Sequence, residues 1–398
     1  MLLTFLRRRL LLPLAIIALP ACSGEVAPAD AGHRDGASDE TSIADAVADG
    51  GADVLGRTRE RCNRVDDDGD GKIDEGCPIR ITTDPGDDVD ADLQGGRVVW
   101  NNARVTYIRT LPSGAIERLP FFCAAPSLWG ARLACIGDGE YLVYDLAAFT
   151  RTRVDTTDSA GLLWPRLHGD ILAWTQYMVG EGNSENTEVW ARDLATGQTV
   201  RVTNDAAISL SARVDGRALA WSDDRRGHHA IFFAHQFDVF TTTLGAAQPE
   251  RAVTNRAGDL QIGSVMGFER GRVLVTDSYQ PWIAAPPPAR CQPVFYDVAT
   301  GARTELSPLD ERCDEAAALS GNRVAVLFDR LGVSDIFLID ASTHQRRRVT
   351  NYPRRSERPL LDGDLLVWSD DRNDNWDLYM MDVSDIEVGD LSPEGVTP

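Results

Sequence analysis

Short apolar runs recur along the chain from residue 78 onward. Two of them, RALAW at 217–221 and DLLVW at 364–368, continue in the same way, so that WSDDR occurs at 221–225 and again at 368–372. Runs without polar alternation are typical of strands that are covered on both faces. The pattern predicts short β-strands packed between neighbouring sheets.

A glycine precedes each apolar run and gives the repeat length. After this glycine come the apolar run, an acid, a second apolar run and a turn such as DLATG at 193–197, and RVTN closes two of the units. Four strands per unit, at spacings of about 35 to 55 residues, indicate propeller blades. The seven aligned glycines are Gly95, Gly130, Gly169, Gly216, Gly271, Gly321 and Gly363.

These motifs resemble those of the TolB-like propeller superfamily, over about four-fifths of the chain. The resemblance implies an all-β, seven-bladed propeller of four-stranded blades over residues 78–398, and it implies nothing about activity. Two segments compete to close the ring, residues 79–83 (IRITT) and residues 386–391. We expect residues 79–83 to pair with residues 377–383, because Gly389 and Asp390 weaken the other segment as a strand.

The first 21 residues predict a secretory signal peptide. Three arginines, residues 7–9, precede an apolar stretch that is too short to span a bilayer. The sequence LPAC at 19–22 resembles a bacterial lipoprotein box, which implies a lipidated Cys22 at the mature N-terminus; ordinary signal cleavage beside an incidental cysteine is the alternative. Ser23 favours the outer membrane by analogy with such lipoproteins.

Composition separates the next segment from the propeller. Residues 22–61 are small and acidic, with almost no large apolar side chain, so they predict a disordered tether. The whole chain has a formal net charge of −21, which repels nucleic acid phosphates and anionic lipid. We therefore expect no nucleic acid partner and membrane association through the lipid anchor alone.

Six cysteines remain after Cys22, an even number that predicts disulfides in an exported protein. Six cysteines permit about fifteen pairings. Their spacing favours Cys62 with Cys77, Cys123 with Cys135, and Cys291 with Cys313.

The first cysteine pair brackets a candidate calcium loop, residues 62–77 (CNRVDDDGDGKIDEGC). Alternate carboxylates can converge on a hard cation, a glycine permits the sharp turn, and the Lys72 carbonyl can supply another oxygen. The stretch departs from the EF-hand at position 12, where Cys77 replaces the bidentate Glu, and Glu75 is the substitute. The expected calcium ligands are Asp66, Asp68, Asp70, Lys72, Asp74 and Glu75.

The same stretch resembles more closely a Cys- and Asp-rich metal-binding motif found in exported proteins of myxobacteria and their relatives. Arg64 stands where that motif has Gly, and Gly69 stands where it has an inner Cys. An internal cross-link is therefore lost. The alternative to a metal site is a solvated acidic hairpin held by a disulfide.

Function is less well specified than fold. WSDDR is repeated, so we interpret its Asp-Arg pair as a structural tie between adjacent blades rather than a ligand site. Long insertions at 175–188 and 276–294 carry Tyr177, Tyr279 and Trp282 as candidate ligand-binding residues. His228, His229 and His235 come from one blade and do not predict a catalytic or metal site.

The sequence favours a non-enzymatic lipoprotein of the cell envelope that binds or scaffolds a protein or a glycan. A propeller enzyme acting on polysaccharide, of the lyase or glycosidase type, is the alternative, and a purely structural envelope protein is a third. An acid, an Arg and a His or Tyr converging from different blades at one channel mouth would favour the enzyme.

Overall fold

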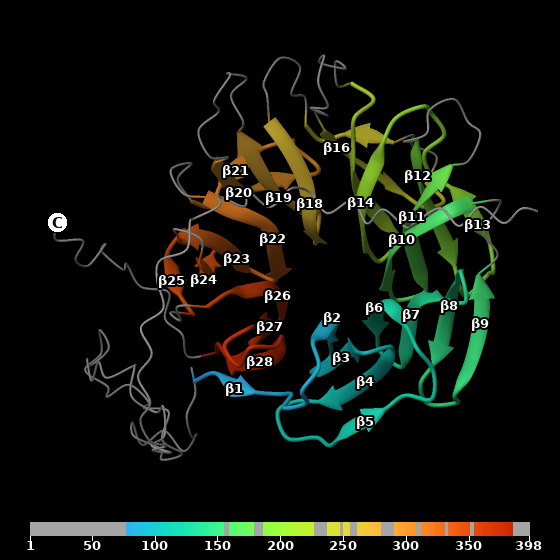
Figure 1. The fold of residues 1–398 in the computed structure, drawn as a ribbon. Coiled ribbons are helices and arrows are strands. Elements are labelled where there is room, and N and C mark those ends of the chain that lie inside the picture. Colours follow the sequence, from blue (N-terminus) through green and yellow to red (C-terminus); the bar gives the residue numbers. More distant parts are fainter. Residues whose placement is uncertain are drawn as a thin grey trace, which may run out of the picture. The chain divides into compact units, whose positions relative to one another are not determined.

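The computed structural model describes residues 77–154, 159–178, 186–226, 237–246, 250–254, 261–279, 290–307, 312–330, 333–350 and 354–384. These residues form seven four-stranded antiparallel sheets around a common axis (Figure 1). The prediction of a seven-bladed propeller is confirmed. This part of the chain contains no helix with the length and apolar character needed to cross a membrane.

Each blade has its first strand nearest the axis, and strand order follows the sequence in blades 1 to 6. Blades 1 and 2 consist of β2 (Asp88–Gln94), β3 (Arg97–Asn102), β4 (Val105–Thr110), β5 (Ile116–Arg118), β6 (Ala124–Trp129), β7 (Arg132–Gly137), β8 (Glu140–Asp145) and β9 (Thr150–Val154). Blades 3 and 4 consist of β10 (Ser159–His168), β11 (Ile171–Met178), β12 (Thr187–Asp193), β13 (Thr199–Arg201), β14 (Ser209–Asp215), β15 (Ala218–Asp223), β16 (Asp238–Thr243) and β17 (Arg251–Ala252).

The later blades keep this plan until the ring closes. Blades 5 and 6 consist of β18 (Gln261–Glu269), β19 (Arg272–Tyr279), β20 (Arg290–Asp297), β21 (Arg303–Glu305), β22 (Arg312–Ser320), β23 (Arg323–Arg330), β24 (Val333–Asp340) and β25 (Arg346–Arg348). Blade 7 consists of β26 (Ser356–Asp362), β27 (Leu365–Asp370), β28 (Asp377–Asp382) and β1 (Ile79–Arg80).

The core is divided among the blade interfaces. The described residues form seven apolar clusters, one between each pair of neighbouring blades, including one between blades 7 and 1. The second strand of each blade contributes to clusters on both of its faces, which is why RALAW and DLLVW lack polar alternation. Four tryptophans from these second strands are fully buried: Trp100, Trp174, Trp221 and Trp368.

The N-terminal strand closes the ring, as the sequence predicts. Ile79 lies opposite Met380, and Arg80 lies opposite Tyr379. The Ile81 N–H donates to the Leu378 carbonyl at 2.7 Å. The competing segment, residues 386–391, lies outside the described residues.

The closing segment repeats the side-chain contacts of RVTN. Thr82 Oγ1 accepts a hydrogen bond from the backbone N–H of Leu378 at 2.9 Å, as Thr350 does from Ile336 at 2.8 Å in blade 6. Arg80 pairs with the buried Asp377 at 2.7 Å. The same contacts therefore hold an outermost strand whether it comes from the N-terminus or from within its own blade.

The two ends of the ring differ in their connections. Strand direction alternates, so the hairpins between first and second strands and the turns between third and fourth strands share one end, which we call the hairpin face. The connections between second and third strands and those from blade to blade share the other end, the loop face. The predicted Asp turn is confirmed on the hairpin face, where Asp193 Oδ1 accepts the N–H groups of Ala195 and Thr196, and Gly197 has φ 76°.

A chain of hydrogen bonds links the hairpins around the ring. The last residue of a first strand accepts a backbone N–H from the hairpin of the next blade, at distances between 2.6 and 3.0 Å. The acceptor and donor pairs are Gln94 and Gly130, His168 and Gly216, Asp215 and Arg270, Glu269 and Gly321, Ser320 and Gly363, and Asp362 and Gly96. Between blades 2 and 3, Trp129 instead lies against the His168 ring at 3.7 Å.

Strand pairing corrects the alignment of blade 5. The sequence analysis aligned that blade on Gly271, but the hairpin position occupied by Gly130 in blade 2 is held by Arg270, which has φ 52°. The fully buried Val275, and not Thr276, therefore corresponds to Trp221. The shift was missed because a glycine marks the second hairpin position here, whereas the first carries a strained arginine.

Candidate functional site

WSDDR is structural, but it acts within one blade rather than between two. The first Asp of the motif in blade 4, Asp223, is fully buried and accepts Arg225 Nε at 2.8 Å and Nη2 at 2.7 Å. Asp223 also accepts Ser209 Oγ at 2.9 Å and Trp221 Nε1 at 3.2 Å. The expected tie between adjacent blades is thus corrected, since these partners all belong to blade 4.

The second WSDDR repeats these contacts in blade 7. Asp370 accepts Arg372 Nε at 2.8 Å and Nη2 at 2.6 Å, with Ser356 Oγ at 3.2 Å. Arg372 lies over the Tyr379 ring at 4.0 Å, as Arg225 lies over the Phe240 ring at 4.4 Å. The following acid fastens the start of the first strand, because Asp371 Oδ1 accepts the Arg355 N–H at 2.8 Å. The motif therefore holds three strands of one blade together and offers no open ligand group.

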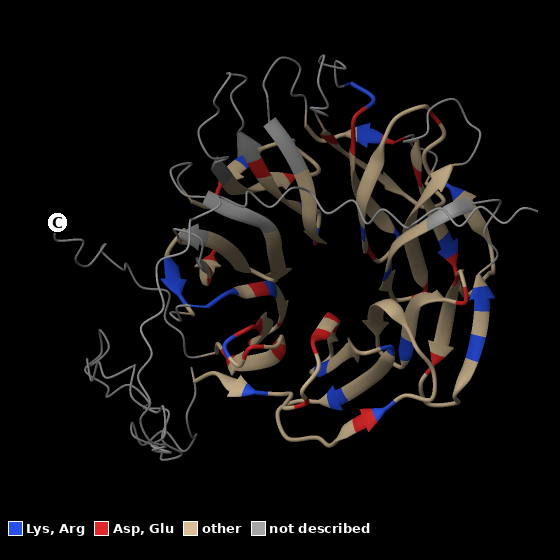
Figure 2. Cartoon of the chain, viewed as in Figure 1, with Lys and Arg blue, Asp and Glu red and all other residues tan. Residues whose placement is uncertain are grey.

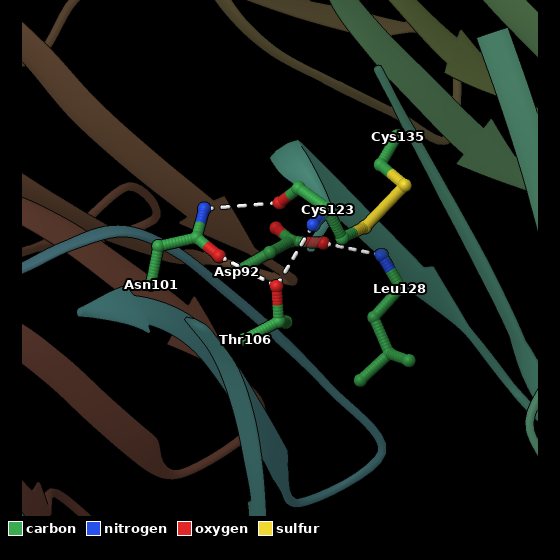
Figure 3. Close-up of a disulfide and its surroundings, with 6 residues drawn as sticks. All are labelled: Asp92, Asn101, Thr106, Cys123, Leu128 and Cys135. Atoms are coloured by element: carbon green, nitrogen blue, oxygen red, sulfur yellow. Dashed lines mark hydrogen bonds between the residues drawn. A yellow bond between two sulfur atoms is a disulfide. The ribbon is translucent and has the colours of Figure 1, made fainter. Parts of the chain in front are cut away.

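The disulfide between Cys123 and Cys135 is confirmed (Figure 3). Cys123 immediately precedes β6 and Cys135 lies in β7, with their Cα atoms 5.2 Å apart. Polar contacts join this site to blade 1: Asn101 Nδ2 donates to the Cys123 carbonyl at 2.9 Å, and the Cys123 N–H donates to Thr106 Oγ1 at 2.9 Å.

Other predicted site residues are only partly described. Cys77 is buried and disulfide-bonded, whereas Cys62, Cys22 and the expected calcium ligands Asp66, Asp68, Asp70, Lys72, Asp74 and Glu75 lie outside the described residues. The backbones of Cys291 and Cys313 lie near the starts of β20 and β22, at the loop face of blades 5 and 6. Within the ranges that the structure describes, no group of three His, Cys, Asp or Glu side chains could hold a metal ion.

The candidate ligand-binding aromatics were expected on the loop face. Tyr177 is half-buried near the end of β11, and the backbone of Tyr279 ends β19, so both positions lie at that face. Trp282 and the histidines His228, His229 and His235 lie outside the described residues. The structure does not bring Tyr177 and Tyr279 into one described site.

A cavity of mixed polar and apolar lining lies instead towards the hairpin face. It has a volume of about 180 Å³, is open to solvent, and is lined by the ends of the first strands of blades 1 to 5. Three charged side chains from three blades line it, namely Asp92, Arg166 and Arg213. We call it the axial cavity; the rest of its lining is Leu93, Gln94, Ser127, Leu128, Trp129, Leu167, Val214 and Phe268.

The electrostatics of the axial cavity are unusual for an acidic protein. Burial, reinforced by the Arg166 guanidinium, lowers the pKa of Arg213 to about 9, which still leaves it charged at neutral pH. Burial also lowers the pKa of Arg166, against the attraction of Asp92. Burial raises the pKa of Asp92, whereas Arg166 and the Leu128 N–H, which donates to Asp92 Oδ2 at 2.6 Å, lower it.

The sequence analysis missed this cavity, although one signal could have found it. Asp92, Ser127, Arg166 and Arg213 each stand three residues before the first hairpin position of their own blade. A repeat is recognised from residues that recur, whereas the residue at this position differs from blade to blade. These four residues are far apart in the sequence and meet only because the ring closes around the axis.

Comparison with known proteins identifies the fold alone. No protein-family model matches the sequence, and no curated protein matches it. Among solved structures, the acylaminoacyl peptidase of Pyrococcus horikoshii is 14% identical with a TM-score of 0.60, over 77% of this chain and 52% of the peptidase. The chain thus spans about half the length of that protein.

Two further solved structures are similar over parts of this chain. An oligogalacturonate lyase in complex with manganese is 12% identical with a TM-score of 0.53, over 73% of this chain and 87% of the lyase. TolB from Acinetobacter baumannii is 17% identical with a TM-score of 0.43, over 61% of this chain and 58% of TolB. The fold assignment rests on the peptidase and the lyase, whose different activities show that this fold does not specify a reaction.

Proposed function

We propose that this chain is an exported lipoprotein whose propeller binds a protein or a glycan at its loop face. One observation carries the proposal: long connections on the loop face occur in three consecutive blades. Residues 179–186, 224–237 and 280–289 join second to third strands in blades 3, 4 and 5, whereas residues 103–104 and 138–139 suffice in blades 1 and 2. The hairpin face has two-residue hairpins in all seven blades.

Rigid support makes such connections suitable for binding. The closing strand and the seven interface clusters hold the strands that carry these connections in fixed positions. Acidic and basic side chains occur on strands around the whole ring (Figure 2), so the blades themselves do not form one surface of a single sign.

Shortened connections test this proposal. In one variant residues 280–289 are replaced by Asn-Gly, and in a control variant the four residues of a turn on the hairpin face, residues 194–197, are substituted instead. The wild type and both variants are immobilised and exposed to detergent-solubilised envelopes and to a panel of purified glycans. Ligand retained by the wild type and the control but lost by the shortened variant supports the proposal, and equal retention by all three contradicts it.

Anchoring and calcium binding belong to the same proposal. Lipidation of Cys22 would tether the propeller to a membrane, by analogy the outer membrane. A calcium ion held by residues 66–75 would stiffen the segment that precedes the closing strand β1. Mass spectrometry of the mature N-terminus, with Cys22→Ala as control, tests lipidation. Calorimetric titration of calcium into the oxidised chain and into Asp66→Ala/Asp70→Ala tests the metal site. Equal heats of binding in the two titrations would exclude the site.

An enzyme acting on polysaccharide is the second candidate, because Asp92, Arg166 and Arg213 converge from three blades. An acid, an Arg and a His or Tyr from different blades at one channel mouth would favour an enzyme. The described lining supplies the acid and the arginines but no His or Tyr. Release of new reducing ends from acidic polysaccharides by the wild type, and not by Asp92→Asn, would favour catalysis over binding.

A further inference from the structure

Arg166 and Arg213 are the two cations of the axial cavity, and their donors are largely unused. Arg213 donates from Nε to the Met266 carbonyl at 3.0 Å and from Nη1 to the Ala212 carbonyl at 3.2 Å. Among the described residues, Arg166 donates only from Nη1, to the Pro165 carbonyl at 3.4 Å. A guanidinium carries about five N–H donors, so most of the donors of this pair have no acceptor in the described part of the chain.

The unused donors face the axial cavity rather than a sealed interior. Several buried side-chain atoms of the described residues lack any partner, including Arg80 Nε and Trp100 Nε1, but no nitrogen of Arg166 or Arg213 is among them. Both side chains line the cavity. A ligand or water in the cavity can therefore reach their free N–H groups.

Other partly buried arginines are compensated by carboxylates. Arg225 binds Asp223 and Glu250, and Arg201 binds the buried Glu188 at 3.0 Å. Arg166 and Arg213 form no ion pair within 4 Å with a described residue, and they are close enough for their charges to interact. Placing two poorly compensated cations together is costly unless an anion joins them.

We propose that Arg166 and Arg213 form a site for the carboxylate group of a small organic acid, held in the axial cavity. With Asp92 ionised, the two guanidiniums leave an excess of one positive charge, which one carboxylate neutralises and a phosphate dianion would exceed. The planar guanidinium also presents paired donors that match the two oxygens of a carboxylate.

The size of the cavity agrees with a small ligand. A volume of 180 Å³ is equivalent to about six water molecules at their share of liquid volume. The Asp92 carboxylate stays at the site because the Leu128 N–H holds it, so its charge opposes any second negative group on the ligand. Asp92 thus acts as a selectivity residue and the two arginines as ligand-binding residues.

Ligand-observed NMR on the full chain tests this site, with line broadening as the measure of weak binding. Acetate is compared with acetamide, and glucuronate with glucose, so that each carboxylate has a neutral counterpart and a simple acid is distinguished from an acidic sugar. Inorganic phosphate, at a mildly alkaline pH at which the dianion dominates, is the third probe. We expect at least one carboxylate to bind, its neutral counterpart not to bind, and phosphate to bind more weakly.

Four variants and one control assign the effect to the named residues. Arg166→Gln and Arg213→Gln should each weaken carboxylate binding at least tenfold, whereas Asp92→Asn, whose amide oxygen can still accept the Leu128 N–H, should strengthen it several-fold. Arg153→Gln removes an exposed arginine from β9 and should change nothing. Arg213→Lys keeps the charge if the glutamine variant does not fold, and it should bind more weakly than the wild type.

Equal binding of the neutral counterparts, unchanged affinity in both arginine variants, or weaker binding in Asp92→Asn would each overturn the proposal. A preference for phosphate over both carboxylates would overturn the charge balance on which it rests. Because the axial cavity and the loop face are at different ends of the ring, shortening residues 280–289 should leave carboxylate binding intact. The failure of one proposal is therefore distinguishable from the failure of the other.

Discussion

Removing the buried carboxylate of the first WSDDR motif should destabilise the propeller. Asp223 is fully buried, and Asp223→Ala leaves four groups without this acceptor: the Arg225 guanidinium, the Arg225 backbone N–H, Trp221 Nε1 and Ser209 Oγ. Breaking a buried ion pair by removing one partner costs about 3–5 kcal/mol. Glu250 and Asp205 remain beside Arg225 and reduce this cost, so we expect about 3 kcal/mol.

The double variant Asp223→Ala/Arg225→Met distinguishes an ion pair from simple packing. Once both charges are gone, the fully buried carboxylate no longer needs a partner, and Glu250 and Asp205, whose side chains are 32% and 33% exposed, can be hydrated instead. The thioether can still cover the Phe240 ring on which Arg225 lies. The double variant should therefore lose clearly less stability than the sum of the two single variants, by at least about 1 kcal/mol of coupling.

Urea unfolding followed by both tryptophan fluorescence and circular dichroism measures these differences, with coincident curves as the test of a single transition. Asn is the matched conservative change, because Asp223→Asn keeps one oxygen for Ser209 and Trp221 but loses the charge. A loss below about 1 kcal/mol in Asp223→Ala, or strict additivity in the double variant, would refute the conclusion that Asp223 and Arg225 form a buried ion pair that stabilises the blade.

Three further predictions follow from the closure of the ring and from its hairpins. Ile81→Ala should cost about 3 kcal/mol because Ile81 is 3% exposed between blades 7 and 1, whereas Ile79→Ala, at a position 45% exposed in the same segment, should cost little; equal thermal shifts would contradict the proposed closure. Arg270→Gly should stabilise the chain by about 0.5–1 kcal/mol, since glycine adopts φ 52° without strain and the backbone N–H still donates to Asp215; a lower melting temperature would exclude this. Burial lowers the pKa of His168 below 6.5, so the unfolded chain binds that proton more tightly, and stability should be complete above about pH 6.5 and fall as the pH drops towards the folded pKa. His168→Gln should abolish this part of the pH dependence of urea unfolding, because Gln94 already accepts the equivalent N–H in blade 1.

The number of blades and the closing strand were predictable from the sequence because both depend on local chemistry. Apolar runs without alternation, an Asp turn and a glycine hairpin recur within each unit, and each is determined by burial or by backbone conformation over a few residues. Residues 79–83 could be assigned to blade 7 because they carry the same Arg and Thr as RVTN, and those side chains make the same contacts there. The disulfide between Cys123 and Cys135 followed from spacing alone.

The register of blade 5 and the partners of WSDDR required the tertiary structure. Two adjacent positive-φ residues, Arg270 and Gly271, form the hairpin, and only strand pairing distinguishes which of them corresponds to Gly130. A repeated Asp-Arg motif is compatible with a contact inside a blade or between blades. The bidentate contact of Arg225 with Asp223, two residues earlier, is a matter of side-chain conformation that the repeat does not specify.

The sequence by itself determined a closed ring of seven blades, since each blade is specified by residues close together in the chain. Only the tertiary structure decided that Asp92, Arg166 and Arg213 share one cavity. Each of these residues is the variable member of an otherwise regular unit, so no repeat marks it. Their meeting depends on the angle between successive blades and on the closure between blades 7 and 1, which bring the ends of five separate first strands around one axis.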